Sequence, residues 1–349
     1  MKNQYLLLVL VLSAALVLPG CAAKSSNCGS PDVFCVGLVT EVGQRDDHGY
    51  NQAAWDGLKQ TKSAKVADWI ASIESVDARD YDENIAVFAD AGYDVIVTVG
   101  SDLGDATRAA AGKYPEAYFI GVDQSEPTDQ APAPNLAGIV FPEDQLGFLA
   151  GAAAALMSQT GKVAAVCVSQ EWLPSRLYAD GFRAGARYID PQVAASVVFH
   201  DEVSLDKTFT DPEWGAATAN ALVDQGVDVI FGIGGTTGSE ALVTASKRGA
   251  YGIGADNDQY FTLPVAAPRL LTSVIKNITP ATAELIGMAR DAQAGISLFP
   301  AGNYAGQVGL APYHDLDGSV PAPVKTRLAE LKIALLSGEV KTGVTGPNP

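Results

Sequence analysis

DVIVTVG, residues 94–100, is an apolar run that closes on a glycine, and the chain repeats its pattern at residues 228–234 as DVIFGIG. Each copy follows a helix-like segment and leads into a polar turn. A second echo lies further on, because YFIGVD at residues 118–123 resembles YGIGAD at residues 251–256. The repeated pattern predicts two similar lobes within one chain.

Apolar, β-branched strands alternate with helix-like segments along the chain. The expected strands cover residues 36–39, 95–99, 118–122, 163–168, 193–198, 227–233 and 252–255. The expected helices cover residues 51–62, 84–91, 106–113, 143–158, 176–188, 216–225 and 239–248. Continuous apolar strands separated by helices indicate βαβ units. We therefore expect an α/β protein whose two lobes are each a mainly parallel sheet with helices on both faces.

A polar turn follows the first expected strand. The stretch GLVTEVGQRDDHGYNQAAWDGL, residues 37–58, passes from an apolar strand through this turn into a helix-like segment. In open α/β sheets, ligands bind beyond the carboxyl ends of the strands. We therefore expect the turn to form one wall of a ligand site.

The first 21 residues have the pattern of an export signal. Lys2 gives a basic start, and residues 6–18 form an apolar run that is too short to span a bilayer comfortably. The run closes on Leu-Pro-Gly-Cys21, which resembles a bacterial lipobox, so Cys21 is the expected lipidation site. Ordinary secretion is the alternative. Residues 22–31 are expected to be a tether, and lipid on Cys21 would hold the exported protein at a membrane of the cell envelope.

The charge of the chain limits its partners. The formal net charge is −17 at pH 7. Nucleic acid and anionic lipid both require basic patches, so neither is expected as the main partner. About 328 residues follow the leader (349 − 21), which is too long for one small core and suits two domains.

Three cysteines follow Cys21. Cys28 and Cys35 lie close together in an exported chain, so they are expected either to form a small disulfide loop or to remain two free thiols. Cys167 lies within an apolar run and is expected to be buried in a strand. The sequence contains no CxxC pair or Cys/His cluster that would suggest zinc.

The residue patterns of common enzymes are missing from the sequence. The chain has three histidines and contains neither a Gly-x-Ser-x-Gly elbow nor a His-Glu-x-x-His helix. The glycine-rich residues 232–238 lack the lysine of a P-loop. Residues 256–258 and 315–318 match only fragments of a calcium-binding loop. We expect no metal, no cofactor and no catalysis.

Several motifs occur together in one order. They are GLVTEVG at 37–43, DDHGYNQ at 46–52, WDG at 55–57, GSDLGDA at 100–106, FLAG at 148–151, GKV at 161–163, DGF at 180–182, GADNDQ at 254–259 and LTSVIKN at 271–277. With these motifs the chain resembles the basic-membrane-protein family, also called purine-nucleoside-receptor-A-like lipoproteins, over nearly all of its mature length.

The resemblance implies a fold and a role. The fold is a type I periplasmic binding protein with two lobes and three crossovers at a hinge. We expect residues 32–142 plus 269–297 in lobe I and residues 143–268 plus 298–349 in lobe II. The role is that of a monomeric binding protein that delivers a nucleoside to the permease of an ABC transporter.

The resemblance also implies two stacking rings. Tyr50 stands where the family usually has a phenylalanine that stacks on the purine. The ring on the opposite side matches Tyr178, and Trp172 is close enough in sequence to compete for that position. The alternatives are a half-exposed loop ring for Tyr50 and a core residue for Tyr178.

Polar positions carry over in the same way. Asp46, Asn51 and Asp105 match positions around the base, where carboxylates accept hydrogen bonds and an amide both donates and accepts. Asp47 is expected to cap the following helix, and Asp105 has the same alternative role.

Around the sugar, Asp256 matches the carboxylate that grips the ribose hydroxyls, and Lys276 matches a nearby lysine whose alternative is a solvated surface position. The turn with Gly234, Gly235 and Thr236 would bring backbone close to the sugar.

Two other functions fit parts of the sequence. The same lobes would serve a sugar, a signal molecule or another small polar ligand. An exported nucleosidase would use carboxylates such as Asp46, Asp47 or Asp256, but no pattern assigns an acid and a base among them.

Overall fold

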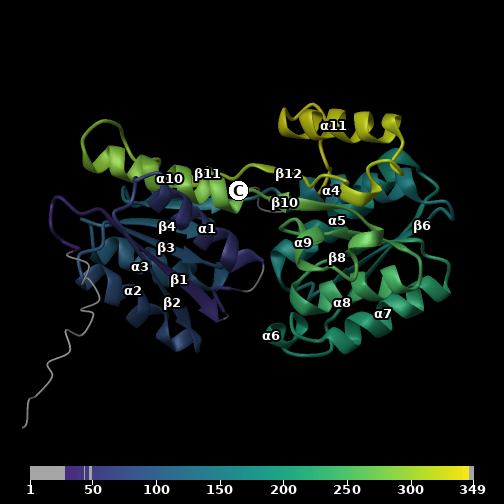
Figure 1. Cartoon of the computed structure of the whole chain (residues 1–349), viewed down its shortest axis with the longest axis horizontal. Helices are drawn as coiled ribbons and strands as arrows, with labels where there is room; N and C mark the ends of the chain where they lie inside the picture. Colours follow the sequence, from purple (N-terminus) through teal and green to yellow (C-terminus); the bar gives the residue numbers. More distant parts are fainter. Residues whose placement is uncertain (1–27, 43, 47–48, 346–349) are drawn as a thin grey trace, which may run out of the picture.

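The protein consists of two lobes that lie side by side along its long axis (Figure 1). The structure, a computed structural model, describes residues 28–42, 44–46 and 49–345. The expected leader, the lipidation site Cys21 and the helix-capping candidate Asp47 lie outside the described residues.

Lobe I is built on six parallel strands in the order β11-β5-β4-β3-β1-β2. Their bounds are β1 Cys35–Val42, β2 Trp69–Ser75, β3 Val95–Val99, β4 Tyr118–Val122, β5 Leu136–Val140 and β11 Gly302–Ala305. In β1, Val36 and Leu38 belong to the core on one face, and Cys35 and Val39 belong to the core on the other. Both faces are therefore covered, as the apolar run predicts.

Lobe II repeats this arrangement in the order β12-β10-β9-β8-β6-β7. Its strands are β6 Lys162–Cys167, β7 Ala194–Phe199, β8 Val229–Gly232, β9 Tyr251–Gly254, β10 Leu270–Lys276 and β12 Val308–Leu310. Only β12 runs antiparallel to its neighbour β10. The two echoed sequence patterns, which include β3 and β4 in lobe I, recur at β8 and β9 in lobe II.

Helices cover both faces of each sheet. In lobe I, α1 (Tyr50–Ser63) packs with α10 (Ile278–Gln293) on one face, and α2 (Tyr81–Asp90) packs with α3 (Gly104–Lys113) on the other. In lobe II the pairs are α4 (Glu143–Met157) with α5 (Leu173–Ile189) and α7 (Pro212–Asp224) with α8 (Gly235–Lys247). Short helices are α6 (Leu205–Thr208) and α9 (Gln259–Thr262), and 3-10 turns lie at Ala78–Asp80, Ser101–Leu103, Ala267–Arg269 and His314–Leu316.

Two of the motifs serve helix packing. In FLAG and the residues before it, a side chain at Gly147 or Gly151 would come within 2.2 Å of the carbonyl oxygens of α5. A side chain at Gly181 or Gly185 would meet the carbonyl oxygens of α4 in the same way. These glycines let α4 and α5 approach backbone to backbone, so the motifs at 148–151 and 180–182 need no ligand to explain them.

The chain passes between the lobes three times, after β5, after β10 and between β11 and β12. Two strands lie in the other sheet from the one expected. Strand β10, expected in lobe I, pairs with β9 of lobe II, and β11, expected in lobe II, pairs with β5 of lobe I. The expected boundaries were wrong there because the sequence of a short apolar strand does not show which strand it will pair with.

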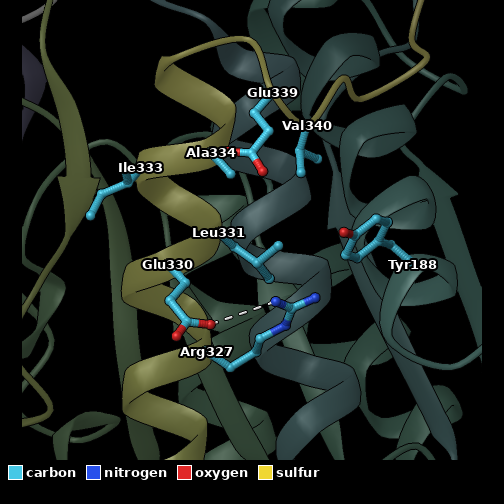
Figure 2. A pocket seen from close by; sticks show the side chains of 8 residues that line it. All are labelled: Tyr188, Arg327, Glu330, Leu331, Ile333, Ala334, Glu339 and Val340. Carbon is cyan, nitrogen blue, oxygen red and sulfur yellow. Dashed lines mark ion pairs between the residues drawn. The ribbon is translucent and has the colours of Figure 1, made fainter.

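A final helix, α11 (Ala322–Leu336), packs on α4 at the outside of lobe II. Between α11 and Tyr188 lies a surface hollow of about 370 Å³, which Arg327, Leu331 and Val340 help to line (Figure 2). Every residue of its lining comes from lobe II, so movement of the lobes leaves it unchanged. Among the described residues, none of the helices has the length and apolar character needed to cross a membrane.

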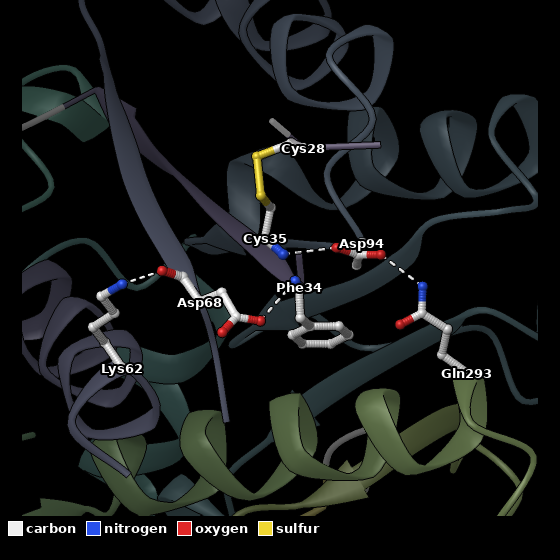
Figure 3. Close-up of a disulfide and its surroundings, with 7 residues drawn as sticks. All are labelled: Cys28, Phe34, Cys35, Lys62, Asp68, Asp94 and Gln293. Atoms are coloured by element: carbon white, nitrogen blue, oxygen red, sulfur yellow. Dashed lines mark hydrogen bonds between the residues drawn. A yellow bond between two sulfur atoms is a disulfide. The ribbon is translucent and has the colours of Figure 1, made fainter. Parts of the chain in front are cut away.

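Cys28 and Cys35 form a disulfide at the start of β1 (Figure 3). Beside it, Asp94 accepts hydrogen bonds from the backbone N–H of Cys35 at 2.7 Å and from the side chain of Gln293 at 2.6 Å. The disulfide, β1 and the end of α10 are thereby joined at one end of lobe I.

Candidate functional site

Lys276 lies at the centre of a buried cluster where the two lobes meet. It is the last residue of β10, and its side chain is 1% exposed. Its Nζ lies 2.8 Å from Asp123 Oδ2 and 2.7 Å from Glu143 Oε1. Asp256 Oδ1 lies further away, at 3.9 Å. Because Asp123 belongs to lobe I and the other two carboxylates to lobe II, the lysine joins both lobes.

The two aspartates reach Lys276 from matching positions. Asp123 follows β4 and Asp256 follows β9, and both have left-handed backbone conformations, with φ of 61° and 68°. Each therefore projects from the carboxyl end of its sheet, where α/β proteins bind ligands. Glu143 arrives differently, as the first residue of α4 directly after the first crossover.

Aromatic rings surround the ammonium group. The ring centroids of Phe141, Tyr178 and Tyr50 lie 5.4, 5.8 and 5.9 Å from Lys276 Nζ. A ring face attracts a cation, so these contacts help to hold the buried charge. The Tyr50 hydroxyl also donates to the backbone carbonyl of Val122 at 3.3 Å.

Tyr178 is fully buried, and its hydroxyl donates to Asp256 Oδ1 at 2.7 Å. Its ring packs edge-on against Phe231, with centroids 5.8 Å apart. Tyr178 therefore occupies a core position, which is the alternative role expected for it. It also donates a hydrogen bond to Asp256, a member of the cluster.

Burial and charge shift the acidities within the cluster. Burial raises the pKa of Glu143 to about 7 although Lys276 acts in the opposite direction. Burial also raises the pKa of Asp256, against the attraction of Lys276. Burial disfavours the ammonium form of Lys276, but Asp123 and Glu143 outweigh this effect and raise its pKa.

One cation faces three carboxylates, so the cluster is rich in hydrogen-bond acceptors. Such a site suits a ligand that offers O–H or N–H donors, and it repels an anion such as phosphate. In the part of the chain that the structure describes, no group of His, Cys, Asp and Glu side chains is arranged to hold a metal ion.

Comparison with known proteins identifies the family of this chain. The family described as "ABC transporter substrate-binding protein PnrA-like" matches residues 34–303. The chain belongs to this PnrA-like family. The resemblance seen in the sequence motifs is therefore confirmed.

Relatives of this PnrA-like protein match it over most of its length. The "CD4+ T-cell-stimulating antigen" of Listeria monocytogenes is 28% identical, covering 96% of this chain and 97% of the relative. The "ABC transporter nucleoside-binding protein BmpA" of Lactococcus lactis is 26% identical, covering 93% and 92%. A solved solute-binding protein of an ABC transporter system from Aeropyrum pernix K1 has the same fold, with a TM-score of 0.73 at 21% identity, covering 90% of this chain and 94% of the other.

Membership of the PnrA-like family implies a small-molecule ligand and a permease partner, and the fold is that of type I periplasmic binding proteins. The structure brings four of the expected site residues to the cluster, namely Tyr50, Tyr178, Asp256 and Lys276. Lys276 is buried there, so its alternative as a solvated surface lysine is wrong.

The three expected base-reading residues differ in exposure and in their contacts. Asp46 is 62% exposed and forms an ion pair with Arg45 at 2.7 Å. Asp105 is 99% exposed in the first turn of α3 and pairs with Arg108 at 2.8 Å. Asn51 is buried in α1, where its side-chain N–H donates to the carbonyl of Gln44 at 3.1 Å.

Gly235 and Thr236 begin α8 and are exposed. Thr236 donates to the carbonyl oxygen of Phe209 from its backbone at 2.9 Å and from its hydroxyl at 3.2 Å. The ring of Phe209 packs edge-on against Trp172 with centroids 5.1 Å apart, and both rings are half-buried. Trp172 thus keeps partly accessible ring surface, whereas Tyr178 does not.

Sequence reasoning missed Asp123, Glu143 and Phe209. The signal for Asp123 was present, because the echo of YFIGVD and YGIGAD aligns it with Asp256. Glu143 resembled an ordinary acidic residue in the first turn of a helix. Phe209 lies in an irregular segment with no periodic pattern that would single it out.

Proposed function

We propose that this chain is the lipid-anchored binding protein of an ABC importer and that it captures a nucleoside, with a purine preferred, between its two lobes. The observation that carries the proposal is the acceptor-rich Lys276 cluster, which lies at the carboxyl ends of strands from both lobes. The name of the Lactococcus lactis relative supports the ligand class.

In this proposal Asp256 accepts hydrogen bonds from the 2′ and 3′ hydroxyls of the ribose. It is the carboxylate furthest from Lys276, at 3.9 Å, and its side chain is 27% exposed. Tyr178 and Lys276 hold it in place, and the backbone around Gly235 and Thr236 approaches the sugar.

The base stacks on Tyr50 from lobe I, and Trp172 with Phe209 supplies the rings of lobe II. Stacking of a base on an aromatic side chain contributes roughly 1–3 kcal/mol. Asp46, Asn51 and Asp105, which belong to lobe I like Tyr50, read the edge of the base. Binding occurs without turnover, because two of the carboxylates that a nucleosidase would use already have partners: Tyr178 donates to Asp256, and Asp46 pairs with Arg45.

Outside the site, we propose that lipid on Cys21 holds a monomer at the cell envelope and that the permease receives the ligand there.

A ligand screen tests the proposal. Purified mature chain is heated with inosine, adenosine, guanosine, uridine or free ribose, and the unfolding temperature is recorded. Purine nucleosides should give the largest increase, because a ligand at about 100 times its dissociation constant adds roughly 2.7 kcal/mol of stability. Stabilisation by ribose alone would reassign the protein to sugars, and conversion of inosine to base and ribose, measured by chromatography, would make it an enzyme.

A further inference from the structure

The loop that follows α10 presents two apolar side chains to solvent. Leu298 is 93% exposed, the highest value among the exposed large hydrophobic residues described, and Ile296 is 74% exposed. The loop GISLFPAG, residues 295–302, contains no charged residue. The loop therefore carries two exposed apolar side chains and no charge.

The structure holds this loop at both ends. Gly295, with φ of 71°, ends α10 in a Schellman motif, since its N–H bonds to the carbonyl of Ala292 and the N–H of Ile296 bonds to that of Asp291. The residue at the position of Ile296 usually packs back on the helix. Here the helix offers the charged residues Asp291 and Arg290 at the matching positions, and Ile296 stays 74% exposed.

At its other end the loop is held by Phe299. This ring is buried and packs on Tyr118, with centroids 4.8 Å apart. Ile296 and Leu298 therefore project from a fixed turn. We call these two residues the apolar tip.

The apolar tip lies at the end of lobe I where the N-terminal tether arrives. A hollow of about 370 Å³ lies between residues 31–34 and residues 290–294, the segment that leads into the tip. Asp94 bonds both Cys35 and Gln293 across this region (Figure 3). Tyr118, under the tip, begins β4, whereas Asp123 of the ligand cluster follows its end.

The length of the tether limits the distance of this end from a membrane. Six residues, 22–27, separate Cys21 from Cys28. A fully extended chain advances at most about 3.6 Å per residue, so lipid on Cys21 keeps Cys28 within about 25 Å of the membrane surface.

We propose that Ile296 and Leu298 dip into the lipid interface as a second contact beside the tether and orient lobe I on the membrane. The inference rests on the proposed lipid anchorage. The net charge of −17 disfavours anionic lipid, so the expected surface is zwitterionic, such as phosphatidylcholine. The ligand cluster, at the opposite ends of the lobe I strands, stays clear of the membrane.

Site-specific labelling tests the proposal without relying on natural lipidation. The chain from residue 22 carries an N-terminal histidine tag and is attached to phosphatidylcholine vesicles that contain a nickel-chelating lipid. An environment-sensitive dye is placed on Leu298→Cys, and a matched variant carries it on Leu336→Cys, an exposed leucine of α11 in lobe II. The native cysteines do not compete, since Cys167 is buried and the other two are bonded.

The dye at position 298 should shift to shorter wavelength on attachment and be quenched by nitroxide-labelled lipid, whereas the dye at position 336 should show neither change. Equal behaviour of the two positions, or no change at 298, would overturn the proposal.

Vesicle affinity gives a second measurement. The untagged double variant Ile296→Ser/Leu298→Ser should bind phosphatidylcholine vesicles at least about tenfold more weakly than the untagged parent chain, which corresponds to about 1.4 kcal/mol of apolar burial. Equal partitioning would count against the tip. Nucleoside binding by the double variant should equal that of the parent, so failure of the tip and failure of the nucleoside proposal remain distinguishable.

Discussion

Asp123 and Asp256 occupy the same place in their lobes but have different partners. Both follow equivalent strands in left-handed conformations. Asp123 pairs directly with Lys276 at 2.8 Å and is 10% exposed. Asp256 lies 3.9 Å from Lys276, accepts from Tyr178 and is 27% exposed. Repeated backbone geometry thus supplies one carboxylate that neutralises the lysine and another that is free enough to meet a ligand.

Removal of Lys276, the partner of both aspartates, should have the largest effect on stability and on nucleoside binding. Lys276→Ala leaves Asp123 and Glu143 without their cation, and breaking a buried ion pair costs about 3–5 kcal/mol. We expect a loss of stability of this size in urea denaturation and no nucleoside binding in calorimetry. Lys247→Ala, at an exposed lysine, is the control and should change stability by less than about 0.5 kcal/mol. Binding within twofold of the parent would remove Lys276 from the site.

The two aspartates should separate in their response to the sugar. Asp256→Asn should weaken inosine binding at least about tenfold, because a hydrogen bond to a charged group contributes roughly 1.5–3 kcal/mol. It should also narrow the difference between inosine and 2′-deoxyinosine. Asp123→Asn should lower the free energy of unfolding by roughly 1.5–3 kcal/mol. It should leave the affinity difference between inosine and 2′-deoxyinosine unchanged. Calorimetry measures the affinity of the parent and the two variants for inosine and for 2′-deoxyinosine. If both variants change the affinity difference between the two ligands equally, the proposed division of roles between the aspartates is wrong.

Tyr50 should depend on its ring, whereas Tyr178 should depend on its hydroxyl group. Tyr50→Ala should weaken nucleoside binding about tenfold, whereas Tyr50→Phe should keep most of the affinity, since stacking needs the ring. Tyr178→Phe should cost roughly 1.5–3 kcal/mol in stability or binding, because it removes the donor at 2.7 Å from Asp256. If Tyr50→Phe is as damaging as Tyr50→Ala, the hydroxyl of Tyr50 is read directly and the stacking role is wrong.

The last effect is expected from pH. Burial raises the pKa of Glu143 from its ordinary value of 4.5 to about 7. Between these values the folded chain holds a proton that the unfolded chain has released, so this contribution to stability is complete below about pH 4.5 and is lost as pH rises to about 7.

The Glu143→Gln variant cannot titrate there. Its urea stability, compared with that of the parent at several pH values, should fall less steeply across this window. Parallel curves for the two proteins would show that Glu143 keeps an ordinary pKa. Glu330→Gln, at an exposed glutamate of α11, is the matched control and should follow the parent at every pH.

The sequence predicted the architecture well because its signals are local. Apolar runs separated by helical segments mark both sheets, and the echo at residues 94–100 and 228–234 marks the two lobes. Strand partners are not local, so β10 and β11 were assigned to the wrong lobes.

The site was predicted in part for the same reason. Asp256 and Lys276 carry recognisable motifs, and the structure brings them together. The role of Glu143 depends on a lysine more than a hundred residues away, which no local pattern reveals. The burial of Tyr178 likewise follows from the close approach of α4 and α5, which brings its backbone against Gly147.

The disulfide between Cys28 and Cys35 has a mechanical consequence. Cys35 is the first residue of β1, which is hydrogen-bonded to β2 on one side and β3 on the other. A pull on the N-terminal end of the lobe therefore acts along β1 and loads two ladders of hydrogen bonds in shear, where many bonds must break together. Without the disulfide the same pull would first peel away residues 28–34 one at a time. In the proposed lipid-anchored protein, tension through the tether would therefore reach the interior of a sheet before it could unravel residues 28–34.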